Sequence, residues 1–225
     1  MTIRNGVIAF AALIVAGVVG YGLFRSTAID VSGEYAEGTH YTVIEGTVTP
    51  KIGPIKVTEF FSYGCVHCRN FDPMVNDWLR GAPKDVAFDR NPVSFSPEWN
   101  LLAQSYFALQ SLNALDDNHA RLFAAIHDNH KQFLTADMVA GFVDGHGVTR
   151  QAFLTAFNSP AIVSATAQAA KRDRALRVNS VPYVTVADHY AINMGDAVPR
   201  KKAFDVVDFL VAKIRAERAP KGGGS

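Results

Sequence analysis

The chain of 225 residues contains only two cysteines, too few for a small fold held together by several disulfide bonds. It also lacks a charge excess of one sign, because 22 basic and 21 acidic side chains leave a net charge of +1. Proteins that bind nucleic acid usually carry a basic surface, so we expect no nucleic acid among the partners. We find no internal repeat and no low-complexity tract. A globular chain of this length can build its own hydrophobic core.

One long hydrophobic segment stands apart from this ordinary composition. Residues 6–24 carry no charged side chain over 19 positions, which is enough to span a bilayer as a helix. A cleaved signal peptide has a shorter apolar run, of about 7–15 residues, and then a cleavage site with small residues. The run Ser26-Thr27-Ala28 matches such a site poorly. We therefore favour an uncleaved transmembrane anchor over a cleaved signal. Under either interpretation we expect the rest of the chain to be exported.

The hydrophobic pattern then predicts an α/β fold with an inserted helical block. Residues 55–62 read as a central strand buried on both faces, and residues 86–95 as a second strand. An amphipathic helix between them contains Pro73. The predicted parts are a transmembrane anchor or signal at 1–25, a tether and irregular lead-in at 26–53, a first α/β part at 54–96, a helical insertion at 97–179, a second α/β part at 180–218, and a tail at 219–225 that ends in a linker-like Gly-Gly-Gly-Ser.

Both cysteines lie in a C-x-x-C motif at the predicted junction of the first strand and its helix. Unpaired backbone N–H groups and the helix dipole stabilise a thiolate at a helix N-terminus, so Cys65 is the expected reactive sulfur. Cys68, one turn further on, is the expected resolving sulfur. His67 adds a donor or a partial positive charge beside Cys65, which favours the dithiol form and makes the disulfide more oxidising. Val66 contributes shape alone.

Two other uses of the motif remain open from these residues. Half of a zinc site is one, but a structural zinc site needs four ligands and only scattered histidines are available. A purely structural disulfide is the other, but so small a loop constrains the unfolded chain little. Thiol–disulfide exchange is the favoured interpretation.

The stretches EFFSYGCVHC (residues 59–68) and VNSVPYVTV (residues 178–186), separated by a helical insertion, resemble the DsbA family of periplasmic thiol:disulfide oxidoreductases. The resemblance covers residues from about 40 to 217. It implies a thioredoxin-like fold with an inserted α-helical domain, and an enzyme that needs no bound cofactor and no metal. By this resemblance Cys65 and Cys68 correspond to the nucleophilic and resolving cysteines.

The other expected site residues also follow from the family. His67 matches its dipeptide histidine, whereas Val66 replaces the proline that is common there and is expected beside the bound substrate. Pro182 matches the cis-proline that faces the disulfide, and Val181 precedes it, so both are expected to bind substrate through the backbone. An ordinary turn proline is the alternative.

Glu59 matches the acidic residue that the family carries beneath its active site. A carboxylate in an apolar strand needs a partner unless it lies at an edge that faces solvent, which is the alternative interpretation. Arg90 falls where the family often has a partner lysine. We therefore predict a Glu59–Arg90 pair that keeps the carboxylate charged and lets it tune the cysteines or carry a proton.

The remaining motifs give weaker expectations. Tyr63-Gly64 replaces two aromatic residues that often precede the first cysteine, which predicts a smaller apolar rim around it. His127 and His130 could suggest a metal site, but paired histidines without a third ligand are more often simply solvated. The histidines to which we assign no role are His40, His119, His146 and His189.

Taken with the resemblance, these residues predict an oxidase that donates its Cys65–Cys68 disulfide to cysteine-containing exported proteins. A quinone-linked membrane protein of the DsbB type would reoxidise it. The domain would lie in the bacterial periplasm, either held to the inner membrane by residues 6–24 or soluble if residues 1–25 are removed. The alternatives are a DsbA-like domain that acts as an anchored subunit or assembly factor of a membrane complex, and a reductase or isomerase.

Overall fold

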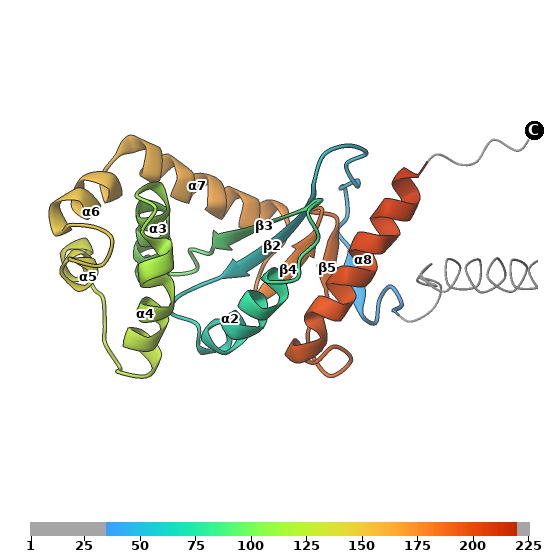
Figure 1. Ribbon diagram of the computed structural model, residues 1–225, viewed down its shortest axis with the longest axis horizontal. Helices are drawn as coiled ribbons and strands as arrows, with labels where there is room; N and C mark the ends of the chain where they lie inside the picture. Colours follow the sequence, from blue (N-terminus) through green and yellow to red (C-terminus); the bar gives the residue numbers. More distant parts are fainter. Residues whose placement is uncertain (1–34, 220–225) are drawn as a thin grey trace, which may run out of the picture. The chain divides into compact units, whose positions relative to one another are not determined.

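The computed structural model describes residues 35–219, so the predicted anchor and most of the tail lie outside the described residues. Among the helices of this part, none is long and apolar enough to cross a membrane. The elements in chain order are β1 (Tyr41–Val43), β2 (Ile55–Phe61), α2 (Val66–Leu79), β3 (Val86–Pro92), α3 (Pro97–Ser111), α4 (Leu115–His127), α5 (Ala136–Val143), α6 (Arg150–Phe157), α7 (Pro160–Ala175), β4 (Tyr183–Val186), β5 (Tyr190–Ile192), a 3₁₀ turn (Arg200–Lys202) and α8 (Ala203–Arg218) (Figure 1).

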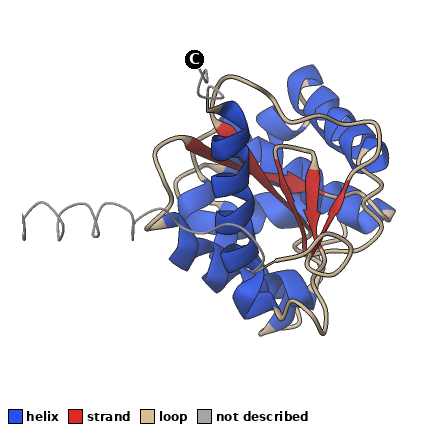
Figure 2. Cartoon of the chain, turned by 90° about the vertical axis from the view of Figure 1, so that its right-hand side faces the viewer, coloured by secondary structure: helices blue, strands red, loops and turns tan. Residues whose placement is uncertain are grey.

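The strands form one sheet in the order β1-β5-β4-β2-β3. The pairing of β2 with β3 is parallel, and the other pairings are antiparallel. Helices lie on both sides of this sheet (Figure 2). The predicted β-α-β unit, helical insertion and closing β-β-α unit are therefore present.

Alternation along β2 divides the core into two faces. Ile55 and Val57 point into a cluster that α2 and α8 cover, with Phe71 and Leu210 fully buried there. Phe60 points to the opposite face and packs in a separate cluster. Both faces of β2 are covered, which confirms the prediction of a strand buried on two sides.

The helices α3 to α6 gather beyond the carboxyl end of β2 and share a core of their own (Figure 1). Phe61, the last residue of β2, is fully buried in this core together with Leu109 and Phe153. Cys65 and Cys68 belong to the same cluster. The helical insertion therefore packs directly against the segment that carries the cysteines.

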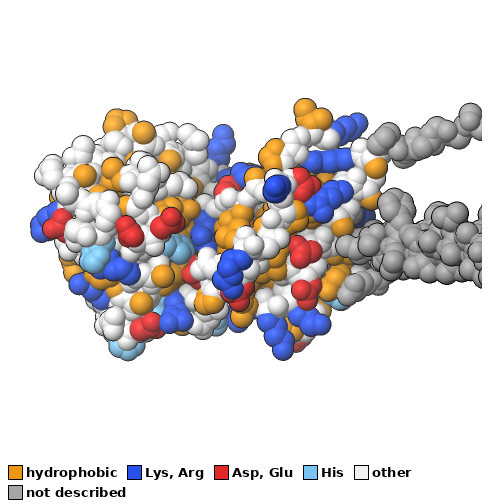
Figure 3. Space-filling view, in the orientation of Figure 1, with side chains coloured by type: hydrophobic (Ala, Val, Ile, Leu, Met, Phe, Trp, Pro, Cys, Tyr) orange, Lys and Arg blue, Asp and Glu red, His pale blue; other side chains and the backbone are white. Residues whose placement is uncertain are grey.

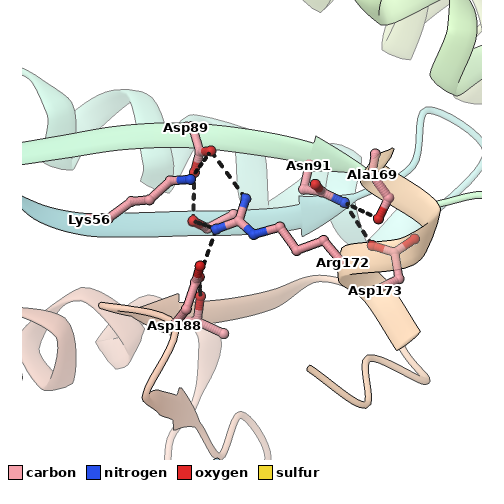
Figure 4. A network of polar contacts seen from close by, with 9 residues as sticks. Lys56, Asp89, Asn91, Ala169, Arg172, Asp173 and Asp188 are labelled. Carbon is pink, nitrogen blue, oxygen red and sulfur yellow. Dashed lines mark hydrogen bonds and ion pairs between the residues drawn. The ribbon is translucent and has the colours of Figure 1, made fainter. Parts of the chain in front are cut away.

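Arg172 joins α7 to the sheet through a set of polar contacts (Figure 4). Its guanidinium donates to Thr58 Oγ1 at 2.7 Å, to Asp188 Oδ1 at 2.6 Å and to Asp89 Oδ2 at 3.2 Å. Lys56 Nζ lies 3.0 Å from the same Asp89 oxygen. These bonds connect β2, β3 and the β4–β5 turn to the helix that leads back from the insertion.

The neighbouring Asp173 is buried and accepts a hydrogen bond from Asn91 Nδ2 at 2.7 Å (Figure 4). Burial raises the pKa of Asp173 to about 7, because it disfavours the charged carboxylate more than the nearby donors favour it. Helix α7 is thus fixed to the sheet by the buried Asn91–Asp173 hydrogen bond and by the partly exposed contacts of Arg172.

The lead-in and the second strand differ from the prediction. The lead-in at 26–53 was expected to be irregular, but its described part contains β1, which pairs with β5. A strand of three residues is stabilised by its neighbour rather than by its own pattern. The second strand was expected to run from 86 to 95, but β3 ends at Pro92. Side-chain oxygens of Thr135, Thr149 and Ser159 cap α5, α6 and α7 by accepting from a backbone N–H group of the first helical turn.

The surface carries a mixture of charges. On the face that Figure 3 shows, acidic and basic side chains are interspersed over the described part of the molecule. No area of one sign dominates that face, which agrees with the nearly balanced charge count.

Candidate active site

Cys65 and Cys68 lie where β2 leads into α2. After β2 ends at Phe61, the backbone N–H of Cys65 donates to the Ser62 carbonyl oxygen at 3.1 Å and turns the chain into the helix. Cys65 is the N-cap residue, with φ −100° and ψ 113°, and the backbone N–H of Cys68 donates to its Sγ atom at 3.4 Å. The predicted position of the pair at a helix N-terminus is therefore confirmed.

The two thiols differ in exposure and in acidity. Cys65 retains 9% of its surface and Cys68 none, so an approaching molecule reaches the Cys65 sulfur first. The hydrogen bond from the Cys68 thiol, and then those from the backbone N–H groups of Cys68 and His67, lower the pKa of Cys65 to about 6 against the effect of burial. The charge of His67 adds less than these bonds do. Burial raises the pKa of Cys68, so the pair presents one accessible thiolate and one buried thiol.

The loop before β4 brings Val181 and Pro182 to this pair. The peptide bond between them is cis, and the Cys65 thiol donates to the Val181 carbonyl oxygen at 3.4 Å. Val66, which follows Cys65 in the sequence, has 48% of its surface exposed. A cavity of about 510 Å³ opens here, lined by His67, Ser180, Val181, Pro182, Met194 and Arg200, among others. The structure therefore brings the predicted cysteines, dipeptide and proline loop together at one surface.

Glu59 lies beneath the cysteines and is 1% exposed. Residues Glu59 and Arg90 are partners in the β2–β3 register, and Arg90 Nε donates to Glu59 Oε2 at 2.8 Å, which confirms the predicted pair. The predicted charge on Glu59 is not confirmed. Burial raises the pKa of Glu59 to about 7, because it outweighs the opposing effect of Arg90. Arg90 also donates to Asp72 Oδ1 at 2.8 Å, so its charge is divided between two carboxyl groups.

Two histidines of α4 extend this site and were missed by the sequence analysis. His119, to which no role was assigned, lies between the Tyr63 hydroxyl (2.8 Å to Nδ1) and Asp72 Oδ1 (3.1 Å to Nε2). His127 was expected to be solvated, but its Nε2 atom lies 2.8 Å from the Tyr63 carbonyl oxygen. The spacing of 119, 123 and 127 on one helix face was a usable signal. His130 is exposed, and no group of three His, Cys, Asp or Glu side chains in residues 35–219 is arranged to hold a metal ion.

An aromatic ring from α3 lies against the turn before Cys65. A side chain at Gly64 would overlap the indole of Trp99, so only glycine allows this close approach. Phe95 stacks on Trp99 with ring centroids 5.7 Å apart and is 45% exposed. The smaller rim expected from Tyr63-Gly64 is thus offset by aromatic rings that come from a different part of the sequence.

Comparison with known proteins agrees with this geometry. Residues 56–204, more than half of the chain, match the family model described as a DSBA-like thioredoxin domain. This chain belongs to the DsbA family. The thiol:disulfide interchange protein DsbA of Pseudomonas aeruginosa is 35% identical over 184 residues, which cover 81% of this chain and 87% of that protein. The DsbA of Azotobacter vinelandii is 33% identical and covers 84% and 86% of the two chains.

Solved structures of the DsbA family show the same fold. The crystal structure of Pseudomonas aeruginosa DsbA aligns with a TM-score of 0.77 and 34% identity, over 83% of this chain and 97% of that one. The DsbA oxidoreductase of Xylella fastidiosa aligns with a TM-score of 0.76 and 28% identity, over 82% and 100%. The chain is thus a DsbA-like protein-disulfide oxidoreductase with a thioredoxin-like α/β fold and a helical insertion, as the sequence predicted.

Proposed function

We propose that this enzyme works as an oxidase that donates the Cys65–Cys68 disulfide to other proteins. The observation that supports this direction is the lowered pKa of Cys65, about 6 against an ordinary value of 9.0. At pH 7 such a thiol is mostly ionised, which stabilises the dithiol form by roughly 1–2 kcal/mol, or about 30 mV of redox potential. A stabilised dithiol makes the disulfide a stronger oxidant, whereas a reductase needs the opposite bias.

The exchange would proceed in two displacements. A substrate thiolate attacks Cys65 Sγ of the oxidised pair, the bond between the two enzyme sulfurs breaks, and the Cys68 sulfur leaves and takes up a proton. A second substrate thiolate then attacks the substrate sulfur of this mixed disulfide, and Cys65 leaves as a stable thiolate. The substrate loses two electrons and gains a disulfide, and the enzyme is left as a dithiol.

In this proposal the surface around Cys65 holds the substrate. The backbone of Val181 and Pro182 would pair with an extended peptide, and the adjoining cavity would receive its side chains. His67 and Val66 would line the approach to the sulfur. Glu59, with its pKa near 7, would give a proton to the Cys68 sulfur as it leaves and accept one on its return.

The export of substrate and enzyme belongs to the same proposal. The uncharged segment 6–24 supports either a membrane anchor or an export signal, and both lead to the periplasm. A quinone-linked membrane protein of the DsbB type would restore the disulfide. The intact mass of the mature protein, and its distribution between membrane and soluble fractions, would distinguish an anchor from a removed signal.

Two measurements test the proposed direction. The wild-type disulfide should oxidise a reduced peptide with two cysteines, and Cys65→Ser should abolish this activity. Equilibration with glutathione should give a potential well above that of thioredoxin, which is about −270 mV. A potential near the thioredoxin value, or a wild-type protein that leaves the peptide reduced, would rule out the oxidase.

A further inference from the structure

Helix α4 of the insertion encloses Tyr63, which precedes Cys65 by two positions. The tyrosine is 1% exposed, and its ring meets the ring of Phe123 edge to face with centroids 5.0 Å apart. The ring centroid of His119 lies 5.2 Å from that of Tyr63. His119, Phe123 and His127 lie at intervals of four residues along one face of α4. One helix face thus packs against the turn that carries the reactive cysteine.

The same face holds Tyr63 by hydrogen bonds at two points. Asp72 can only accept at this site, so His119 Nε2 carries the hydrogen that it donates to the carboxylate. Burial lowers the pKa of His119 and keeps its ring neutral, which leaves Nδ1 to accept from the Tyr63 hydroxyl. At the other point, His127 Nε2–H donates to the Tyr63 carbonyl oxygen. The side chain and the backbone of Tyr63 are therefore fixed by different histidines.

The geometry of the turn decides how well α2 stabilises a Cys65 thiolate. Within the turn, the hydroxyl and carbonyl oxygens of Ser62 accept from the backbone N–H groups of Gly64 and Cys65 at 3.1 Å each. The backbone N–H of Cys68 donates to Cys65 Sγ at 3.4 Å, an ordinary length for a hydrogen bond to sulfur. A small shift of the turn would lengthen this contact and weaken it steeply.

We propose that His119 and His127 are positioning residues that fix Cys65 against the N-terminus of α2 by holding Tyr63. The helical insertion then influences the reactivity of the cysteine pair through Tyr63, in addition to packing against it. Neither histidine contacts the sulfur, and each acts through a different atom of the tyrosine. The inference concerns the acidity of Cys65 and holds whichever way the enzyme transfers electrons in the cell.

The test uses the reduced full-length protein and four variants. Tyr63→Phe removes only the hydroxyl that bonds His119, and His127→Leu removes only the donor to the carbonyl. His127→Gln keeps an N–H donor and should restore the wild-type behaviour. His146→Leu is the control, because that side chain is exposed in a loop of the same insertion. Thiolate absorbance at 240 nm as a function of pH gives the Cys65 pKa, and equilibration with glutathione gives the exchange constant.

We expect His127→Leu and Tyr63→Phe to raise the Cys65 pKa by about half a unit or more. The equilibrium constant for reduction of the Cys65–Cys68 disulfide by glutathione should then fall about threefold. His127→Gln and His146→Leu should stay close to the wild type. If His127→Leu and Tyr63→Phe unfold more easily but keep the wild-type pKa of Cys65, the histidines are merely structural and the inference is wrong. Tyr63→Phe retains the ring packing, so it decides the question even if His127→Leu fails to fold. Peptide oxidation does not enter this readout, so failure of the proposed oxidase would not imitate either result.

Discussion

The buried carboxyl group of Glu59 makes the stability of the fold depend on pH. Its pKa rises from an ordinary 4.5 to about 7 in the folded state. A carboxyl group with a raised pKa binds its proton more tightly in the folded than in the unfolded chain. Its contribution to stability is therefore complete below pH 4.5 and is lost as the pH rises to 7. A rise of about 2.5 pKa units corresponds to a loss of about 3 kcal/mol.

Glu59→Gln should remove most of this dependence. The amide has nearly the same shape, cannot ionise, and keeps an oxygen that can accept the Arg90 hydrogen bond. Arg90 loses a charged partner but keeps its ion pair with Asp72 at 2.8 Å, so the gain should be smaller than the full value. We expect the variant to exceed the wild type by about 1–3 kcal/mol at pH 8 and to match it near pH 4.5.

Urea unfolding of the oxidised protein at the two pH values measures this difference, because the disulfide form has no Cys65 thiolate to complicate the titration. Glu45→Gln serves as the control, since Glu45 forms an exposed ion pair with Arg177 and its loss should change little at either pH. A Glu59→Gln variant that is less stable at pH 8, or that differs equally at both pH values, would show that Arg90 keeps Glu59 charged and would refute the reasoning.

Three further changes have definite expected outcomes. Cys68→Ser treated with oxidised glutathione should stay joined to one glutathione through Cys65, visible in the intact mass, because the Cys65 thiolate displaces one glutathione thiol and no Cys68 thiol remains to displace the other; rapid release of the bound glutathione would contradict the role of Cys68. Gly64→Ala should lower the unfolding free energy by about 1–3 kcal/mol, since its methyl group overlaps the indole of Trp99, whereas a methyl group at Gly81 would meet the Trp78 carbonyl oxygen at an ordinary 3.9 Å and should not. Asp173→Asn should be more stable than the wild type at pH 8 but not at pH 4, because burial raises the aspartate pKa to about 7; a gap that is independent of pH would contradict this.

The cysteine motif could be interpreted from sequence because its chemistry is local. A buried strand, a short turn and an amphipathic helix follow one another within residues 55–79, so the helix N-terminus falls at Cys65. The family resemblance also identified Glu59 and Arg90 as partners. Their protonation could not be predicted, because it depends on complete burial and on Asp72 taking a share of the Arg90 charge.

The histidines of α4 show why the rest of the site escaped prediction. His119 and His127 meet Tyr63 across 56 and 64 positions of sequence. Their helical spacing identifies a common face but not what that face packs against. Trp99 raises the same difficulty, since nothing near Gly64 in the sequence indicates which ring fills the space beside it. Contacts between distant segments depend on the packing of the whole insertion against the sheet.

The contact between Cys65 and Val181 also bears on how the enzyme matures, because it spans 116 positions of the chain. During synthesis the two cysteines emerge before the helical insertion, and β4 emerges only after it. Pairing over such a separation forms late in folding. The nascent chain therefore carries both free thiols before its site exists. With no third cysteine in the sequence, the only disulfide that it can close within itself is the one it will later exchange.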